Sequence, residues 1–273
     1  MRQQLDTGTE DLLAEVDDGV AVLTMNRPGR RNAMSEAMMA AMDRVLGDVE
    51  ADDAVGCVVL TGAGGGFCAG GDVKAMTERP AADRAHDMDA AIHRQRLRQR
   101  ATSGRLWHMP KPTIAAIGGP AAGAGLSLAL ACDLRYAVEG AVLTTAFARV
   151  CFSGDYGGTW FLTRLVGSAK AKELYYFSER LTAADAERLG IVNAVFPAAG
   201  FETEVRQRAR RLAHGPRLAH RYMKENLNRA VHGELGECMD IEATHHIRTG
   251  LTDDHREAAK AFVDRRDPHF TGH

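Results

Sequence analysis

The sequence lacks most of the features that would direct it to nucleic acid, to a metal or to an oxidising compartment. Its 34 basic and 36 acidic side chains give a formal net charge of −2, so no excess of positive charge favours a phosphate backbone. The five cysteines form no CxxC pair, and the eleven histidines include no HExxH motif. Because the first residues carry no secretory signal, we expect a cytoplasmic protein with reduced cysteines, no metal and no nucleic-acid partner.

Long apolar runs are also scarce. One uncharged stretch, residues 113–132 (TIAAIGGPAAGAGLSLALAC), is long enough to span a bilayer as a helix. Gly118, Gly119 and Pro120 would break that helix in its middle. The pattern therefore predicts a buried strand over Thr113–Ile117, a turn and a buried helix, and no membrane segment.

Strands and helices are mixed in the first part of the chain, and helices dominate the rest. The sequence predicts strands over residues 12–16 and 20–26, joined by a turn at Asp17-Asp18-Gly19, and a helix that Ser35 caps. A strand over residues 57–61, a long polar helix over 82–107, and strands over 133–138 and 141–147 follow. From residue 170 on, the patterns are almost entirely helical. This order indicates an α/β core over residues 1–197 and a helical region over 198–273.

Two glycine-rich segments, residues 59–73 and 115–137, each follow a predicted strand and precede a predicted helix. Such turns direct backbone N–H groups and a helix dipole at whatever lies in the turn. The dinucleotide pattern GxGxxG fails at Phe67, and the phosphate loop fails because Gly71-Asp72 replaces its lysine and hydroxyl residue. An oxyanion hole, in which two N–H groups meet at one carbonyl oxygen, suits the pair of turns.

A near-match to a hydrolase motif lies in the second segment. Residues 125–129 (GLSLA) differ from the GxSxG nucleophile elbow only in the final alanine. A serine in an apolar helix is more often a packed residue that bonds to its own backbone. A serine hydrolase is thus the weaker interpretation of this segment.

Several motifs in order resemble the crotonase family, the enoyl-CoA hydratase/isomerase group. Besides the glycine-rich segments, they are NRPGRRNAM (26–34), GDYGGTWFLTRLVG (154–167) and LTAADAERLGIVNAVFP (181–197). The resemblance implies an α/β fold, the crotonase-like spiral of ββα repeats, with a C-terminal helical trimerisation region. It also implies homotrimers or hexamers, an acyl-CoA substrate, and no tightly bound cofactor beyond the CoA of that substrate.

The resemblance assigns roles to particular residues. The amides of Gly71 and Ala124 are implied as the two donors of the oxyanion hole. Arg30 and Arg31 are candidates for binding the CoA phosphates. The other implied CoA contacts are main chain near Ala33, Ala69, Asp72 and Val73, and Phe262 and Arg265 of the same or a neighbouring subunit.

The sequence departs from the hydratases of this family at their two catalytic glutamates. The first falls on Ser127, and the second falls near Ala148 or Arg149. One acid remains in a suitable place, Asp155 in SGDYGG. This segment resembles that of dienoyl-CoA isomerases and of the ring-epoxide isomerases of phenylacetate breakdown. One carboxylate suffices for a 1,3-proton shift, and partial burial would raise its pKa into a useful range. Capping of the next helix is the alternative role of Asp155.

The preferred hypothesis is therefore enoyl-CoA double-bond isomerisation through an enolate, with Asp155 as the proton carrier. The first alternative is an enoyl-CoA hydratase of fatty-acid (β-oxidation) or aromatic-acid degradation that uses Asp155 and a water. The second is a non-catalytic acyl-CoA-binding subunit. Tyr156 lines the acyl pocket or packs internally, and Cys68 and Cys151 are expected in the core. Residues 76–106 are expected to form part of the acyl pocket.

Overall fold

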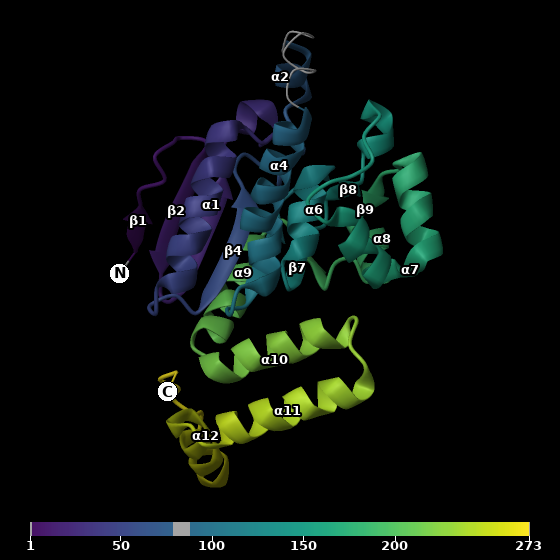
Figure 1. Cartoon of the computed structure of the whole chain (residues 1–273). Helices are drawn as coiled ribbons and strands as arrows, with labels where there is room; N and C mark the ends of the chain where they lie inside the picture. Colours follow the sequence, from purple (N-terminus) through teal and green to yellow (C-terminus); the bar gives the residue numbers. More distant parts are fainter. Residues whose placement is uncertain (1, 79–87, 273) are drawn as a thin grey trace.

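A computed structural model describes residues 2–78 and 88–272, and two sheets form its framework (Figure 1). The main sheet has the strand order β1-β2-β3-β4-β5-β7-β10. Its first three strands are antiparallel, and β3, β4, β5, β7 and β10 run parallel. The strands are β1 (Gln3–Leu5), β2 (Leu12–Asp17), β3 (Val20–Met25), β4 (Cys57–Gly62), β5 (Thr113–Ile117), β7 (Leu134–Val138) and β10 (Ala194–Phe196).

The β2–β3 hairpin follows from its turn residues. Asp18 and Gly19 both have positive φ, at 53° and 76°, as a two-residue hairpin turn requires. Leu12 pairs with Met25 and Asp17 with Val20, so the predicted hairpin is confirmed.

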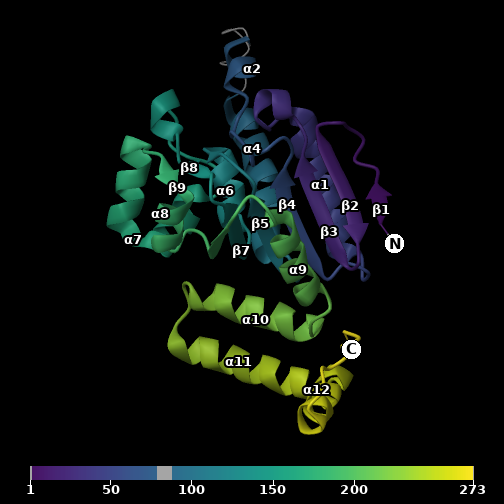
Figure 2. The same cartoon turned by 180° about the vertical axis from the view of Figure 1, so that it is seen from behind.

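Helices cover both faces of the main sheet. Every residue of β5 is buried, as is typical of a parallel strand that is covered on two sides. Helix α1 (Glu36–Ala51) lies over β2 and β3, and α9 (Phe201–Ala213) lies on the opposite face, which Figure 2 shows from behind. The Ser35 side chain caps α1 by accepting a hydrogen bond from the Met38 amide at 3.0 Å, as predicted.

A second, three-stranded sheet completes the core. Its order is β6-β8-β9, and a bridge between Cys68 and Ala121 lies beside it. The strands are β6 (Ala121–Ala122), β8 (Val142–Thr144) and β9 (Leu181–Thr182). Strands of the main sheet thus lead into strands of the small one and then into helices, as in β5-β6-α6, which confirms the expected fold of ββα repeats.

The remaining helices are mostly those that the sequence predicts. They are α2 (Val73–Glu78), α4 (Met88–Gln99), α5 (Arg105–His108), α6 (Ala124–Ala131), α7 (Gly158–Phe177), α8 (Ala183–Arg188), α10 (Arg217–Ala230), α11 (Leu235–Gly250) and α12 (Asp253–Asp264). Short 3-10 helices span Pro28–Arg30 and Phe147–Val150.

Three local predictions need correction. The long helix over 82–107 is divided, because a π-helical stretch, Arg100–Gly104, separates α4 from α5, and its first residues lie outside the described ones. The strand over 141–147 ends at Thr144. Cys68 is fully buried, but Cys151 is exposed at the end of a 3-10 helix and is not a core residue.

Helix α9 packs on the sheet, whereas α10, α11 and α12 extend below it in Figure 1. Lys224 fastens α10 to the core, since its buried ammonium group lies 2.9 Å from the Asp133 carboxylate and 3.0 Å from the Leu106 carbonyl oxygen. The boundary proposed at residues 197/198 stays a prediction. None of the helices formed by the described residues is long and apolar enough to cross a membrane.

Candidate active site

The two glycine-rich segments lie side by side and open into one pocket. A parallel bridge joins Cys68 to Ala121, and the Ala122 amide donates to the Cys68 carbonyl oxygen at 2.9 Å. Gly71 and Ala124 each stand three residues beyond that bridge, so the register brings them to the same level. Both line a pocket of about 480 Å³ that also contains Asp155, and we call it the Asp155 pocket.

The close contact between the segments explains a glycine at position 70. Gly70 has a φ of +88°, and a Cβ atom there would lie 2.8 Å from the Ala122 carbonyl oxygen and 3.2 Å from the Ala124 amide nitrogen. A larger residue would therefore be strained and would push the two turns apart.

The amides of Gly71 and Ala124 are available to a ligand. Within residues 2–78 and 88–272, no backbone hydrogen bond has either amide as its donor. Ala124 is the first residue of α6, whose leading N–H groups have no partner within the helix. A carbonyl oxygen that gains negative charge beside both amides would be stabilised by them.

Asp155 lines the pocket from a tight turn that precedes α7. Gly154, Tyr156 and Gly157 around it have φ values of 111°, 50° and 75°. The Asp155 Oδ1 is buried, and it has no hydrogen-bond partner among the described residues. Burial raises the pKa of Asp155 from 3.8 to about 6, because water no longer solvates the charged form.

The alternative role of Asp155 as a helix cap is not the one that the structure shows. Helix α7 starts after Gly157, and no side chain among the described residues caps it. Only the backbone carbonyl oxygen of Asp155 takes part, since it accepts from the Gly158 amide at 3.0 Å. The Asp155 carboxyl group thus takes no part in capping α7.

Ser127 lies behind this turn, beside Tyr175. Its hydroxyl donates to the Gly123 carbonyl oxygen at 3.3 Å, and the Ser127 and Tyr175 hydroxyls both lie against Gly158. A Cβ atom at Gly158 would lie 2.7 Å from the Tyr175 oxygen and would also collide with Ser127. The serine bonds to its own helix, as the packed-residue interpretation predicts, and no sequence signal pointed to Tyr175.

The turn at residues 26–34 borders the same pocket through Arg27, which sequence reasoning missed. The Arg27 guanidinium lies 3.1 Å from the Asp72 carboxylate and donates to the Ala33 carbonyl oxygen at 2.7 Å. Buried Asn32 ties the turn to the first glycine segment by donating to the Ala63 and Gly66 carbonyl oxygens. A hydrogen bond from the Ala75 amide, and then Arg27, hold the pKa of Asp72 below its usual value.

The residues implied for CoA divide into two groups. Arg30 and Arg31 are exposed on the turn beside the pocket, Ala33 and Ala69 belong to the bonded segments behind them, and Asp72 and Val73 lead into α2. Phe262 and Arg265 lie instead at the end of α12, and Phe262 is 86% exposed. Figure 1 shows α12 at the opposite end of the molecule from α2. Within one chain the structure does not bring them to the pocket.

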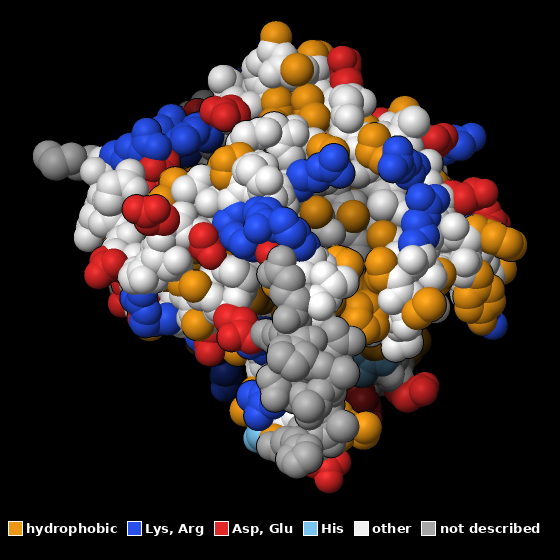
Figure 3. Space-filling view, turned by 90° about the horizontal axis from the view of Figure 1, so that it is seen from above, with side chains coloured by type: hydrophobic (Ala, Val, Ile, Leu, Met, Phe, Trp, Pro, Cys, Tyr) orange, Lys and Arg blue, Asp and Glu red, His pale blue; other side chains and the backbone are white. Residues whose placement is uncertain are grey.

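The face that carries α2 is the open side of the molecule. Seen from above, it shows a hollow with hydrophobic atoms inside and Lys and Arg side chains around it (Figure 3). Such a rim suits a phosphorylated ligand.

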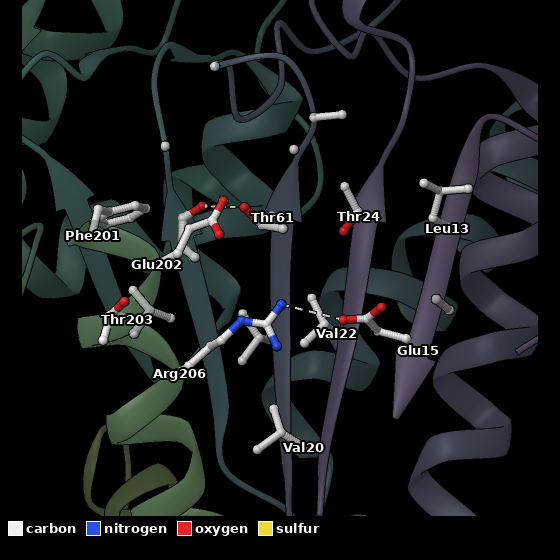
Figure 4. A pocket seen from close by; sticks show the side chains of 18 of the residues that line it. Leu13, Glu15, Val20, Val22, Thr24, Thr61, Phe201, Glu202, Thr203 and Arg206 are labelled. Carbon is white, nitrogen blue, oxygen red and sulfur yellow. Dashed lines mark hydrogen bonds and ion pairs between the residues drawn. The ribbon is translucent and has the colours of Figure 1, made fainter. Parts of the chain in front are cut away.

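A larger cavity of about 720 Å³ lies on the other face of the main sheet, between β2 and α9 (Figure 4). Arg206 points across it to Glu15, at 3.5 Å. Glu15 also interacts with Arg2 and with the Gln4 amide at 3.0 Å. Glu15 is thus paired, and Glu202, the other acid that lines this cavity, is exposed. The Asp155 pocket, which joins a buried carboxyl oxygen to the amides of Gly71 and Ala124, is the better candidate. Among the described residues, no cluster of three metal-ligating side chains occurs.

The chain is similar along nearly its whole length to proteins named for CoA thioesters. The sequence model described as enoyl-CoA hydratase/isomerase matches residues 15–273. The 1,2-epoxyphenylacetyl-CoA isomerase of Escherichia coli strain K12 is 36% identical over 96% of this chain and 99% of the relative. A 4-chlorobenzoyl coenzyme A dehalogenase of an Arthrobacter species is 33% identical over 84% of this chain and 81% of the relative. An enoyl-CoA hydratase from Polaromonas sp. JS666 has a crystal structure that matches with a TM-score of 0.88 and 31% identity, over 95% of this chain and 99% of the other.

Proposed function

Because the chain belongs to the enoyl-CoA hydratase/isomerase family, within the crotonase superfamily, we propose that it isomerises the double bond of an acyl-CoA thioester with Asp155 as the proton carrier. The observation that carries this proposal is the buried Asp155 Oδ1, which lacks a hydrogen-bond partner among the described residues and shares a pocket with Gly71 and Ala124. The name of the relative from Escherichia coli, an isomerase, supports the same reaction class.

The proposed reaction needs only one carboxylate. Asp155 removes a proton from C2 of a 3-enoyl thioester, and the electron pair of that C–H bond moves toward the carbonyl oxygen. The resulting dienolate rests on the amides of Gly71 and Ala124, each of which is expected to contribute about 3 kcal/mol to the transition state. Asp155 then returns the proton to C4, which leaves the conjugated 2-enoyl thioester.

A carboxyl group with a pKa of about 6 suits this task. It is largely ionised near pH 7 and so can accept a proton, and it is a stronger base than an exposed aspartate. Ser127 cannot take the role of a second carboxylate, since a hydroxyl group does not act as a base at neutral pH. The site therefore favours a proton shift over the addition of water by two carboxylates.

We also propose that the enzyme forms homotrimers or hexamers through its C-terminal helices and acts in the cytoplasm on acyl-CoA, with no tightly bound cofactor. Support for assembly comes from apolar side chains of α10 to α12 that are exposed in the single chain. Leu227, Leu235, Leu251 and Phe262 are 69%, 75%, 77% and 86% exposed. In such an assembly, Phe262 and Arg265 would reach the CoA of a neighbouring subunit.

Two substrates distinguish the candidate activities. With a 3-enoyl-CoA, isomerisation produces conjugated-thioester absorbance; with crotonyl-CoA, hydration removes it. The proposal would be supported if the native enzyme produces conjugated-thioester absorbance from the 3-enoyl-CoA and Asp155→Asn does not, while this variant still binds CoA esters with unchanged affinity. Activity in the second assay alone would favour a hydratase, and binding without either activity would favour a non-catalytic subunit.

A further inference from the structure

One cation in the wall of the Asp155 pocket has no anionic partner among the residues that the structure describes. Arg27 and Asp72 form an ion pair there, and Glu36 and Asp155 are the other acids of the wall. Arg98, from α4, lines the same pocket and is half-buried. No ion pair joins Arg98 to a carboxylate within residues 2–78 and 88–272. A partly desolvated guanidinium group of this kind is stabilised by a bound anion.

Contacts of the neighbouring residues hold Arg98 in place. The next residue, Gln99, accepts a hydrogen bond from the Tyr156 amide at 2.6 Å, which fastens α4 to the Asp155 turn. Burial raises the pKa of Tyr156 to about 12, and the nearby Arg98 guanidinium opposes this shift. A π-helical stretch starts directly afterwards at Arg100. The charge is therefore held beside the turn that carries the proposed base.

The polarity of α4 is reversed relative to a helix that lines a hydrocarbon pocket. Its long apolar side chains, Met88, Ile92 and Leu97, are 66%, 42% and 51% exposed. Gln95 and Arg98, one turn apart, are half-buried and line the pocket. An acyl chain without polar groups would leave the Arg98 charge partly desolvated and without an anion.

We propose that Arg98 forms a subsite for a carboxylate at the far end of the acyl chain, so that the substrate is the CoA thioester of an unsaturated dicarboxylic acid. This inference rests on the proposed function, because it assumes that the thioester lies at Gly71 and Ala124. The hydrocarbon portion would then contact Met34, Met39 and Met76, which line the same pocket. Gln95 would donate a second hydrogen bond to the carboxylate.

A matched pair of substrates tests the subsite. The probes are hex-3-enoyl-CoA and the thioester of the same length that carries a carboxylate on its last carbon. We expect the native enzyme to have a kcat/KM at least about 10-fold higher for the carboxylated thioester. Arg98→Gln should lower that value by about 10- to 100-fold and change the value for hex-3-enoyl-CoA less than about 2-fold. Arg96→Gln, on the exposed side of the same helix, is the matched control and should change neither.

Three results would overturn the proposal. They are a native preference for the uncarboxylated thioester, no effect of Arg98→Gln on the preference, and an equal loss for both thioesters together with weaker binding of free CoA. The last result would assign Arg98 to CoA itself. Calorimetric binding of hexanoyl-CoA and its carboxylated counterpart keeps this test separate from catalysis. If neither probe is isomerised but an Arg98-dependent preference in binding persists, the proposed function fails and the subsite stands.

Discussion

Asp155→Asn separates the chemistry of this carboxyl group from its effect on stability. Burial raises the Asp155 pKa from 3.8 to about 6. The folded chain therefore binds more protons at this site than the unfolded chain between these two pH values. The stabilisation is complete below pH 3.8 and is lost as the pH rises through about 6.

The size of the effect follows from the shift. A difference of about 2 pKa units corresponds to about 3 kcal/mol at 1.36 kcal/mol per unit, which is an upper limit. Because the group faces a pocket that water can enter, we expect about 1–2 kcal/mol. The free energy of unfolding of Asp155→Asn, relative to the native chain, should rise by this amount between pH 4 and pH 8.

Urea unfolding at fixed chain concentration measures this difference, because an oligomer's stability depends on concentration. Asp48→Asn is the control, since the Asp48 side chain is 66% exposed and should show no such change. In the same variant, kcat for the 3-enoyl thioester should fall about 10²- to 10⁴-fold, and the native rate should rise with pH through about 6. Parallel stability profiles for Asp155→Asn and the native chain would refute the argument that burial prepares this group as a base.

Three further substitutions test other parts of the site and its support. Gly158→Ala should abolish activity and cost about 1–3 kcal/mol, because its methyl group would collide with Ser127 and Tyr175; removing both hydroxyls in the same chain should recover part of the stability. Ser35→Ala should lower the unfolding free energy by about 1 kcal/mol through loss of the cap of α1, whereas Ser35→Thr, which keeps the hydroxyl that also donates to the Asp11 carboxylate, should lower it less. Lys224→Met should release α10 from the core, which limited proteolysis between the core and the C-terminal helices would detect; unchanged cleavage would contradict this role.

Local patterns predicted the elements of this protein well. The hairpin at Asp18-Gly19 and the cap at Ser35 were predictable because each depends on a few neighbouring residues. Predictions were wrong where packing decides the outcome. The helix after residue 88 contains a π-helical stretch, and Cys151 is exposed although its neighbours resemble core residues.

In the site, too, features that depend on local sequence were predicted, and features that depend on contacts between distant segments were not. The glycine segments and Asp155 were found because they are unusual in the sequence itself. Arg27 was not among the predicted site residues, since nothing in the sequence of that turn tells which of its arginines lines the pocket. Tyr175 escaped notice because it contributes only through contacts with residues far from it in the chain.

By itself the sequence determined most strands and helices of the core, although not β1, β9 and β10, and it determined the family resemblance and the single acid, Asp155, where that resemblance implies two glutamates. These properties depend on residue type and spacing along the chain, which are read directly. Only the tertiary structure decided that Asp155, Arg98 and the amides of Gly71 and Ala124 share one pocket. It also decided that neither these amides nor the buried Asp155 oxygen has a hydrogen-bond partner among the described residues. Burial and pairing are properties of surroundings made up of distant segments, and no local pattern encodes them.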